Sequence, residues 1–552
     1  MLKSVASMGA VAALMAPSGC ITAKVRVEEP LEVGLTKQLL VDDWVITETQ
    51  NLTRSLGCVV KANGGKPLQF TRSAEAGSDT KVDVWPLFAS VYFEPAGKRF
   101  RMWHRVSFND SSRRKGAAAT VDEIGVGAKY VRGYSESTDG IHFKFVAPLE
   151  GLTTSGDTNL VVTIDEHESD PAHRYKIGYD CDDPVHAAAL AHSADGIHWT
   201  PYNRGKPVTY RASDFTNQIL WEPSKRAYRL FTRTDFGGGG GGPLAGKVDV
   251  AIAKEKLEVR GVRSMLNHNF KAEPTDWKLE QHFLLDGEEQ ISSDRPPITE
   301  LLKDPQYLKR VRQEALRRQI YVMTDSIYQG VHFGLMAVLE YPTDVSEGVE
   351  TDHVKRHERS VENYYFATSR DGVHWNFHWV YAGQPLVPRG GAGAWDKDMI
   401  FPTSQIVTQD DRHWIYYGGN NERHGTAEKN VWFVRQGGLG LAHLRLDGFV
   451  ALEAGKEQGY VVTKPFKLDG KQLELNVDAS GRGRVRVEML DAAGSPIAKF
   501  SGKNAADYQG VDKIRHQPAW KSGADLSDLV GQIVRLRIHL TNARLYAFQV
   551  RP

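Results

Sequence analysis

One short phrase recurs along this sequence and constrains the fold more than any other feature. It reads Ser-x-Asp-Gly-x-His followed by Phe or Trp, and it occurs at 137–143, 193–199 and 369–375. Each copy follows a strand-like run, and Asp-Gly is a strong signal for a tight turn. Weaker copies lie at 275–277 and 446–449. Five such positions indicate a strand-and-turn unit that is repeated five times.

Two further apolar runs precede most of these turns. The nearer run is rich in aromatic residues and lies at 99–103, 174–179, 228–231, 331–341 and 412–417. The other run precedes it, at 87–93, 159–164, 215–221, 319–324 and 404–407. Repeated sets of three strands with a turn are typical of a β-propeller, so we predict five blades over 81–455. A large β-sandwich with chance similarity between its strands is the alternative.

The pattern changes near residue 459. Apolar and polar residues now alternate, as in half-buried antiparallel strands, at 472–477, 484–489, 533–540 and 545–550. We therefore predict an all-β protein, with a five-bladed propeller followed by a C-terminal β-sandwich over 456–552. Residues 21–80 are a lead-in segment with the strand that closes the ring. Residues 307–318 have a helical composition and predict a helical insertion before the fourth blade.

The first twenty residues have the layout of a bacterial export signal, with Lys3, a mostly apolar run and small residues before Cys20. The run is too short to span a membrane as a helix. Cys20 follows Ser-Gly as in a lipoprotein cleavage site, and plain cleavage is the alternative. We expect a protein of the periplasm, cell surface or medium, whose only membrane contact is a lipid on Cys20. Cys58 and Cys181 either form a disulfide there or stay unpaired.

The charge balance bears on the partner. The chain has 69 Lys and Arg against 68 Asp and Glu. Binding to nucleic acid draws most of its affinity from a basic excess, which this composition lacks. We therefore expect no nucleic-acid partner.

Carboxylates recur just ahead of the first strand of each predicted blade. Because a propeller directs these strands toward a central channel, we expect the acids to converge on one funnel. They are Asp83, Asp157, Asp214, Glu288 or Glu289, Asp396 and Asp398. Paired carboxylates in an aromatic-lined funnel suit glycoside hydrolysis, and Trp85, Trp221 and Trp395 are placed to stack on sugar rings. The alternative makes the acids turn or cap residues and the tryptophans propeller core.

The five-blade pattern with its turns and trailing sandwich resembles the superfamily of glycoside hydrolase families 32 and 43, and more closely secreted relatives from planctomycete-type bacteria. The resemblance covers nearly the whole mature chain, including 39–44, 318–321 and 396–402. It implies a first-blade carboxylate, an Asp that orients substrate or stabilises the transition state, and a Glu general acid. By position these are Asp83, Asp214 and Glu289, with Asp398 as a further catalytic candidate. Asp43 competes with Asp83 for the first role.

The chain departs from the family 32 pattern at three motifs. It has no Trp-x-Asn-Asp-Pro-Asn, Arg-Asp-Pro or Glu-Cys block. The chemistry of that family is therefore not carried over whole. We expect no cofactor, although Asp side chains and carbonyls of the channel would accommodate a structural Ca²⁺.

Further charged residues are candidates for substrate contact. His353, His357 and Glu358 have a spacing that metal binding would also use, but a helix and a third ligand are not evident, so we predict no metal site. We prefer substrate contact or a salt-bridged loop for Glu358, Arg359, Glu422, Arg423 and His424. Glu358 or Glu422 is then a reserve general acid.

Two arginines, Arg233 and Arg318, are placed to hold a carboxylate or sulfate, because Arg offers two parallel donors. A surface or strand-end role is the alternative for both. Together these residues predict an exported glycosidase whose partner is a carbohydrate. A non-catalytic glycan-binding propeller is the main alternative, and a scaffold for protein partners is a third.

Overall fold

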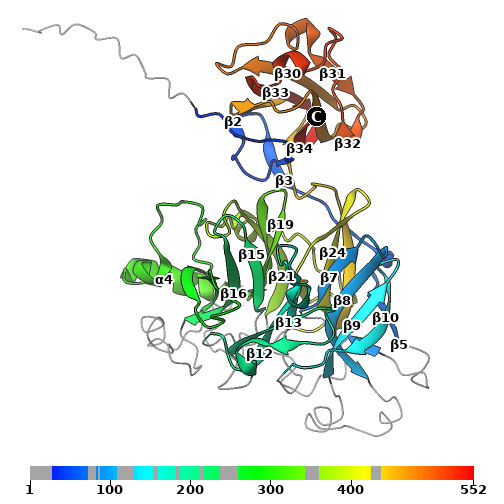
Figure 1. The fold of residues 1–552 in the computed structure, drawn as a ribbon. Helices are drawn as coiled ribbons and strands as arrows, with labels where there is room; N and C mark the ends of the chain where they lie inside the picture. Colours follow the sequence, from blue (N-terminus) through cyan, green and yellow to red (C-terminus); the bar gives the residue numbers. More distant parts are fainter. Residues whose placement is uncertain are drawn as a thin grey trace, which may run out of the picture.

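The structure is a computed structural model that describes residues 28–72, 82–84, 88–108, 130–152, 160–181, 187–209, 216–236, 259–341, 360–423 and 437–552. Within these ranges β-strands dominate (Figure 1), which confirms the predicted predominance of β-structure. No helix in the described part of the chain is long and apolar enough to cross a membrane.

Three sheets are formed by consecutive segments of the chain, and we call them sets 1 to 3. Set 1 has the order β5-β10-β9-β8-β6, and β7 also pairs with β8; the bounds are β5 (Gln69–Arg72), β6 (Val82–Val84), β7 (Ser90–Glu94), β8 (Arg99–Phe108), β9 (Tyr130–Ser137) and β10 (His142–Pro148). Set 2 is β11 (Leu160–Ile164), β12 (Tyr175–Cys181), β13 (Ala187–Ser193) and β14 (Thr200–Pro201). Set 3 is β15 (Gln218–Glu222), β16 (Ala227–Phe236), β17 (Val259–Asn267) and β18 (Lys278–Phe283).

The next sheet has eight strands and consists of two antiparallel sets. Set 4 is β19 (Arg318–Tyr328), β20 (Val331–Glu340) and β21 (Val361–Ser369). Set 5 is β22 (Met399–Pro402), β23 (Val407–Gln409), β24 (Arg412–Asn420), β25 (Gly437–Arg445) and the early strand β4 (Val60–Lys61). A single parallel pair, Glu362 with Met399, joins the two sets. The strand expected at 404–407 is wrong, because the first strand of set 5 is the fully buried run 399–402.

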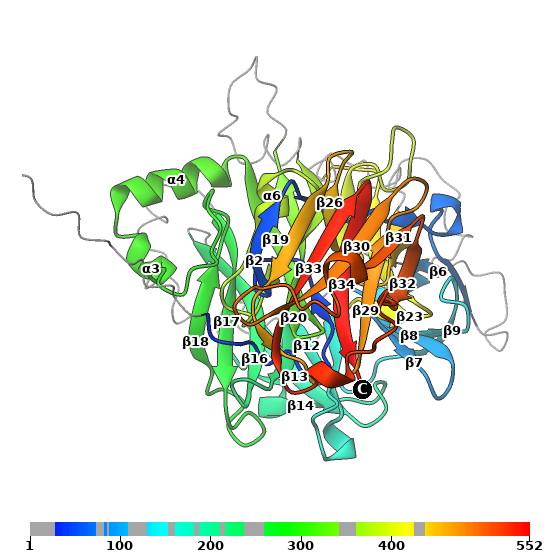
Figure 2. The ribbon, with the colours of Figure 1, turned by 90° about the horizontal axis from the view of Figure 1, so that it is seen from above.

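The five sets contact one another in a closed order. Set 1 contacts set 2 through β7 and β11, set 2 contacts set 3 through β11 and β15, and set 3 contacts set 4 through β17 and β19. Set 4 contacts set 5 through β20 and β22, and set 5 returns to set 1 through β23 and β7. From above, sets 1 and 3 lie on opposite sides of the molecule (Figure 2).

The repeated turns explain part of this order, because each turn binds the set before it. Tyr416 of set 5 donates from its hydroxyl to the carbonyl of Gly140 in the first turn, at 3.0 Å. Trp103 of set 1 donates from Nε1 to the carbonyl of Gly196 in the second turn, at 2.7 Å. A side chain added at Gly140 would collide with Tyr416. These two positions therefore require glycine for close approach as well as for their positive φ.

The other three turns follow the same rule. Lys271, after β17, pairs with Glu168 of set 2 at 2.8 Å. Arg229 of set 3 donates to the carbonyl of Asp371 in the turn of set 4, at 3.1 Å. Tyr328 of set 4 donates to the Asp447 carboxylate in the turn of set 5, at 2.8 Å. Five turns, each bound to the preceding set, connect the sets in one direction around the closed order.

Inside each strong turn, the Asp carboxylate organises the backbone. Asp195 Oδ1 accepts the N–H groups of Ile197 and His198 at 2.8 and 2.9 Å, and Ser193 Oγ accepts the N–H of Gly196 at 2.9 Å. The turns at Asp139 and Asp371 repeat these bonds. Burial favours the neutral acid, but hydrogen bonds from the two backbone N–H groups and the histidine hold the pKa of Asp195 well below its usual range.

We expect Asp195→Ala to lower the free energy of unfolding by about 1–2 kcal/mol, because two turn N–H groups lose their acceptor. Urea denaturation followed by tryptophan fluorescence measures the loss. Asp276→Ala is the matched control, since Asp276 is exposed and pairs only with the exposed Lys278 among the described residues, and its effect should stay within about 0.5 kcal/mol. Equal losses in the two variants would contradict a special role for the turn.

The last part of the chain forms two six-stranded sheets at one end of the molecule (Figure 1). One contains β3 (Thr53–Leu56), β26 (Val450–Ala454), β34 (Ala543–Arg551), β29 (Gln472–Asp478) and β32 (Asp512–His516), with β1 (Gln38–Leu39) paired to β34. The other contains β2 (Ile46–Gln50), β27 (Gly459–Thr463), β33 (Ile533–Thr541), β30 (Arg484–Asp491) and β31 (Ala506–Gln509), with β28 (Phe466–Lys467) paired to β33. They bury one common core, and they take in strands β1 to β3, which were not expected.

Three α-helices are present among the described residues: α3 (Ile298–Leu301), α4 (Pro305–Ala315) and α6 (His378–Tyr381). The helix expected at 307–318 is therefore present, but it ends at Ala315 because Arg318 begins β19. Asp304 caps α4 by accepting the N–H of Gln306 at 2.9 Å. Val311 and Ala315 bury the inner face of α4 in a small core of its own, so the insertion packs at the side of set 3.

Candidate active site

The strand ends opposite the two C-terminal sheets gather buried charged residues. At this end the second strand of each set finishes and the third strand begins, because neighbouring strands run antiparallel. The buried charged side chains there are Arg105, Arg132, Asp180, Arg233, Arg263, Glu362, Asp398 and Glu422. A buried charge is costly unless it is paired, so this end of the molecule is an electrostatically organised surface.

Three of these acids lie on adjacent strands around Asn420. The Glu362 N–H donates to the Asp398 carbonyl at 3.1 Å, and the Asp398 N–H donates to the Asn420 carbonyl at 3.2 Å. The Glu422 N–H donates to Asn420 Oδ1 at 3.1 Å. Adjacent strands are about 4.8 Å apart, so the three residues are spread over roughly 10 Å. We call them the carboxylate cluster.

Exposure separates the members of the carboxylate cluster. Glu362 is 0% exposed, whereas Asp398 and Glu422 are each 8% exposed. Asp398 forms an ion pair with Lys397, and Glu422 follows the last residue of β24 by two positions. The small exposed area of Asp398 and Glu422 leaves these two residues in reach of a ligand, while Glu362 acts from behind them.

A second layer supports the start of β21. Asn363 donates from Nδ2 to Glu340 Oε2 at 2.5 Å and accepts from Arg389 Nε at 2.9 Å. Tyr365 also donates to Glu340, at 3.1 Å. These bonds fix the strand that carries Glu362 against the neighbouring strand β20.

Sequence reasoning named Asp398 and Glu422 but missed Glu362. The signal was present, because a charged residue opens a strand whose nine residues are all buried. It also missed Arg105, Arg132 and Arg263, which interrupt otherwise apolar strand sequences in sets 1 and 3.

Several candidates from the sequence lie elsewhere or cannot be placed. Asp83 lies in β6, paired with Ser107. Glu289 is exposed and faces His378 at 3.4 Å, and Asp43 is exposed and pairs with Arg54 near the C-terminal sheets. Outside the described residues lie Trp85, Asp157, Asp214, His353, His357, Glu358, Arg359 and His424.

The remaining aromatic and charged candidates are bound within the fold. Trp395 stacks on Tyr417 and donates to the Gly65 carbonyl at 2.8 Å. Asp396 is buried and pairs with Lys61 at 2.5 Å. These contacts tie the early strand β4 to set 5, and a sugar-binding role for either residue stays a prediction.

The two arginine candidates occupy different surroundings. Arg233 is buried in β16, at the same end of the molecule as the carboxylate cluster. Arg318 begins β19, pairs with Glu314 of α4 at 3.0 Å and binds the Val380 carbonyl. Trp221 stacks on His167 at 3.8 Å. Cys58 is an exposed free thiol.

Among the residues that the structure describes, no group of three or more His, Cys, Asp or Glu side chains is arranged to hold a metal ion. Two buried histidines near this end are uncharged at neutral pH. Burial lowers the pKa of His104 to about 3, and burial together with Arg263 lowers the pKa of His282 to about 3. The positive charge here therefore comes from arginines.

These histidines predict a pH dependence of stability. Their pKa is lower in the folded state, so the unfolded chain binds more protons below pH 6.5, and stability present above that pH is lost as the pH falls. At pH 5 the loss should be about 2 kcal/mol for each histidine. Urea denaturation at pH 7 and pH 5 measures it: His104→Gln should reduce the pH difference, and the exposed control His268→Gln should not. An unchanged difference in His104→Gln would contradict this account.

No protein-family model matches the chain, and no curated protein matches it. Solved structures with similar topology include a complex of BT0996 with RGII, at 13% identity and a TM-score of 0.38, covering 73% of this chain and 92% of that one. A structure from the GH130 family of mannoside phosphorylases, which contains glycoside hydrolases that target β-1,2 mannosidic linkages in Candida mannan, has 12% identity and a TM-score of 0.38, with 74% and 96% covered. A β-fructofuranosidase from Schwanniomyces occidentalis has 9% identity and a TM-score of 0.34, with 88% and 96% covered.

Proposed function

We propose that this protein is an exported glycoside hydrolase built on a five-bladed β-propeller with a β-sandwich behind it. In this proposal sets 1 to 5 are the blades, and the two C-terminal sheets are the sandwich. The closed order of contacts supports the first assignment, and the common core of the two sheets supports the second. Export, with or without a lipid on Cys20, follows from the first twenty residues.

One observation carries the proposed chemistry: the carboxylate cluster lies on adjacent strands at the end of the ring away from the sandwich. Glycoside hydrolysis needs two carboxyl groups, about 5–5.5 Å apart for retention and 6.5–9.5 Å for inversion. Residues on neighbouring strands span this range. We assign Glu422 as the general acid and Asp398 as its partner, with Glu362 as a positioning residue because it is fully buried.

The proposed steps balance as an ordinary hydrolysis. Glu422 gives its proton to the glycosidic oxygen as the bond to the anomeric carbon breaks. Asp398 accepts a proton from the attacking water, or bonds to the anomeric carbon first and is released by water in a second step. Asp83 and Asp214 stay as further candidates for the second carboxylate.

A glycan panel tests the proposal. The purified chain is incubated with neutral and acidic poly- and oligosaccharides, and new reducing ends are measured; release of reducing ends supports the proposal. Asp83→Asn and Asp214→Asn are assayed alongside, and undiminished activity in both would leave the carboxylate cluster as the catalytic pair. Binding without release of reducing ends on any substrate would contradict hydrolysis.

A non-catalytic glycan-binding propeller is the second candidate. The buried arginines Arg105, Arg132, Arg233 and Arg263 at the same end favour it, because guanidinium groups recognise carboxylate and sulfate groups of sugars. In that case isothermal titration shows saturable binding, and the ligand is recovered intact.

A further inference from the structure

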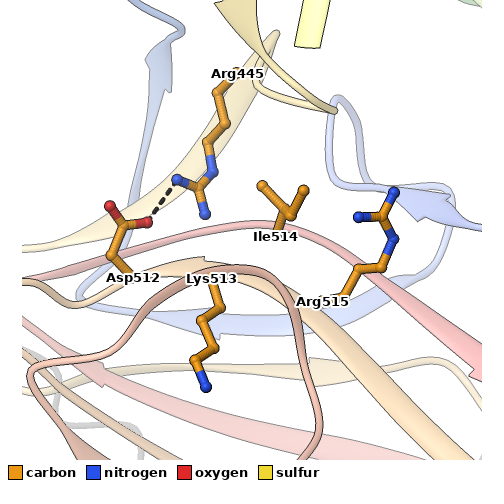
Figure 3. A pocket seen from close by; sticks show the side chains of 5 residues that line it. All are labelled: Arg445, Asp512, Lys513, Ile514 and Arg515. Atoms are coloured by element: carbon orange, nitrogen blue, oxygen red, sulfur yellow. Dashed lines mark hydrogen bonds and ion pairs between the residues drawn. The ribbon is translucent and has the colours of Figure 1, made fainter. Parts of the chain in front are cut away.

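A groove lies between the ring and the C-terminal sheets, far from the carboxylate cluster. Its volume is about 430 Å³, and Arg445, Asp512, Lys513, Ile514 and Arg515 line it (Figure 3). Arg445 ends strand β25, whose first residue pairs with Asn420 beside the carboxylate cluster. Nine extended residues span roughly 27 Å, so the groove is a separate site.

Arg445 is held rigidly at one wall of the groove. Its Nε donates to Asn476 Oδ1 at 2.7 Å, one Nη donates to Asp512 Oδ1 at 2.6 Å, and the other donates to the Val477 carbonyl at 3.3 Å. The guanidinium group also lies 5.2 Å from the centre of the Tyr546 ring. Of its five N–H groups, two are left for a ligand, and a fixed guanidinium loses little entropy on binding.

Arg515 forms the other wall. Its guanidinium group pairs with Asp411 at 2.6 Å, and the half-buried Ile514 lies between it and Arg445 (Figure 3). Lys513 points away from the two guanidinium groups (Figure 3). Three cations and two carboxylates surround the groove, so its net charge is about +1 at neutral pH. Two planar donors around an apolar floor form the shape of an anion site with one dry face.

We propose that this groove binds the carboxylate or sulfate group of an anionic saccharide. Arg445 and Arg515 donate to the anionic group, and Ile514 contacts the apolar face of the sugar ring. The saccharide part of this assignment rests on the proposed function, whereas the anion part rests on the groove alone. Binding here would attach the protein to an acidic glycan at a distance from the carboxylate cluster.

Isothermal titration at low salt tests this proposal with a heparin-derived tetrasaccharide, neutral maltotetraose and inorganic sulfate. The tetrasaccharide should bind at least tenfold more tightly than maltotetraose, and Arg515→Gln should weaken it about tenfold. Lys513→Gln is the matched control, because it removes the same charge from a side chain that points away, and its effect should stay below twofold. Both pairs are exposed enough that neither variant should change the unfolding temperature.

The outcomes discriminate. Equal weakening in Arg515→Gln and Lys513→Gln would mean general electrostatics and would overturn the groove. Sulfate that binds as tightly as the tetrasaccharide would overturn the saccharide assignment. Glu422→Gln should keep the tetrasaccharide affinity of the wild type; a loss there would move the ligand to the carboxylate cluster and overturn the groove without touching the proposed hydrolysis.

Discussion

The Glu422→Gln variant should cleave a glycan substrate on the order of 10²–10⁴-fold more slowly than the wild type. Glutamine keeps the size of the side chain but has no acidic proton for the departing glycosidic oxygen. Substrate affinity should change little, because Glu422 retains its place after β24, where its N–H binds Asn420 Oδ1. Steady-state kinetics therefore show the loss in kcat.

A substrate with a very good leaving group separates catalysis from damage to the fold. A dinitrophenyl glycoside needs no protonation of its leaving group, so Glu422→Gln should cleave it at a rate close to that of the wild type. Asp398→Asn should be slow on both substrates. Glu457→Gln, a change in an exposed glutamate near the C-terminal sheets, should leave both rates unchanged. Equal loss on both substrates in Glu422→Gln would remove its assignment as the general acid.

The Arg229→Ala variant should lose about 3–5 kcal/mol of unfolding free energy. Arg229 is fully buried and binds Glu222 at 2.6 Å and Glu280 at 3.0 Å. It also donates to the Asp371 carbonyl in the turn of set 4. Removal of the guanidinium leaves two buried carboxylates without their cation and breaks the contact between sets 3 and 4. Urea denaturation measures the loss.

Two comparisons make this result specific. Lys278→Ala in the same set removes a cation from an exposed ion pair and should cost less than about 1 kcal/mol. The double variant Arg229→Met with Glu222→Gln should recover part of the loss, because it removes charge on both sides. A loss in Arg229→Ala no larger than that of Lys278→Ala would show that the buried carboxylates are satisfied in another way.

Much of the fold follows from the sequence because the turns are encoded locally. Asp195 and its two copies bind backbone N–H groups within three residues, so the phrase specifies its own geometry wherever it occurs. The strands before each turn were recognisable for the same reason. Strands β1 to β3 were not, since they are short and are stabilised by partners far along the chain such as β34 and β27.

The candidate site was predictable only in part. Asp398 and Glu422 flank strands with clear patterns, so their place at a strand end could be inferred. Glu362 could not be assigned, because its proximity to Asp398 depends on the single parallel pair between sets 4 and 5. The identity of the second carboxylate also depends on how segments far apart in sequence face one another, which local pattern does not encode.

Early strand β4 pairs with β25, and early strand β5 pairs with β10. The first of these partners is made only after nearly the whole chain has been synthesised. Until then the ring has an open edge of unpaired N–H and carbonyl groups, which is a surface for aggregation. Chains that stop before residue 437 should therefore accumulate as insoluble material, and the slowest folding step of the full chain should be the arrival of its own beginning at its end.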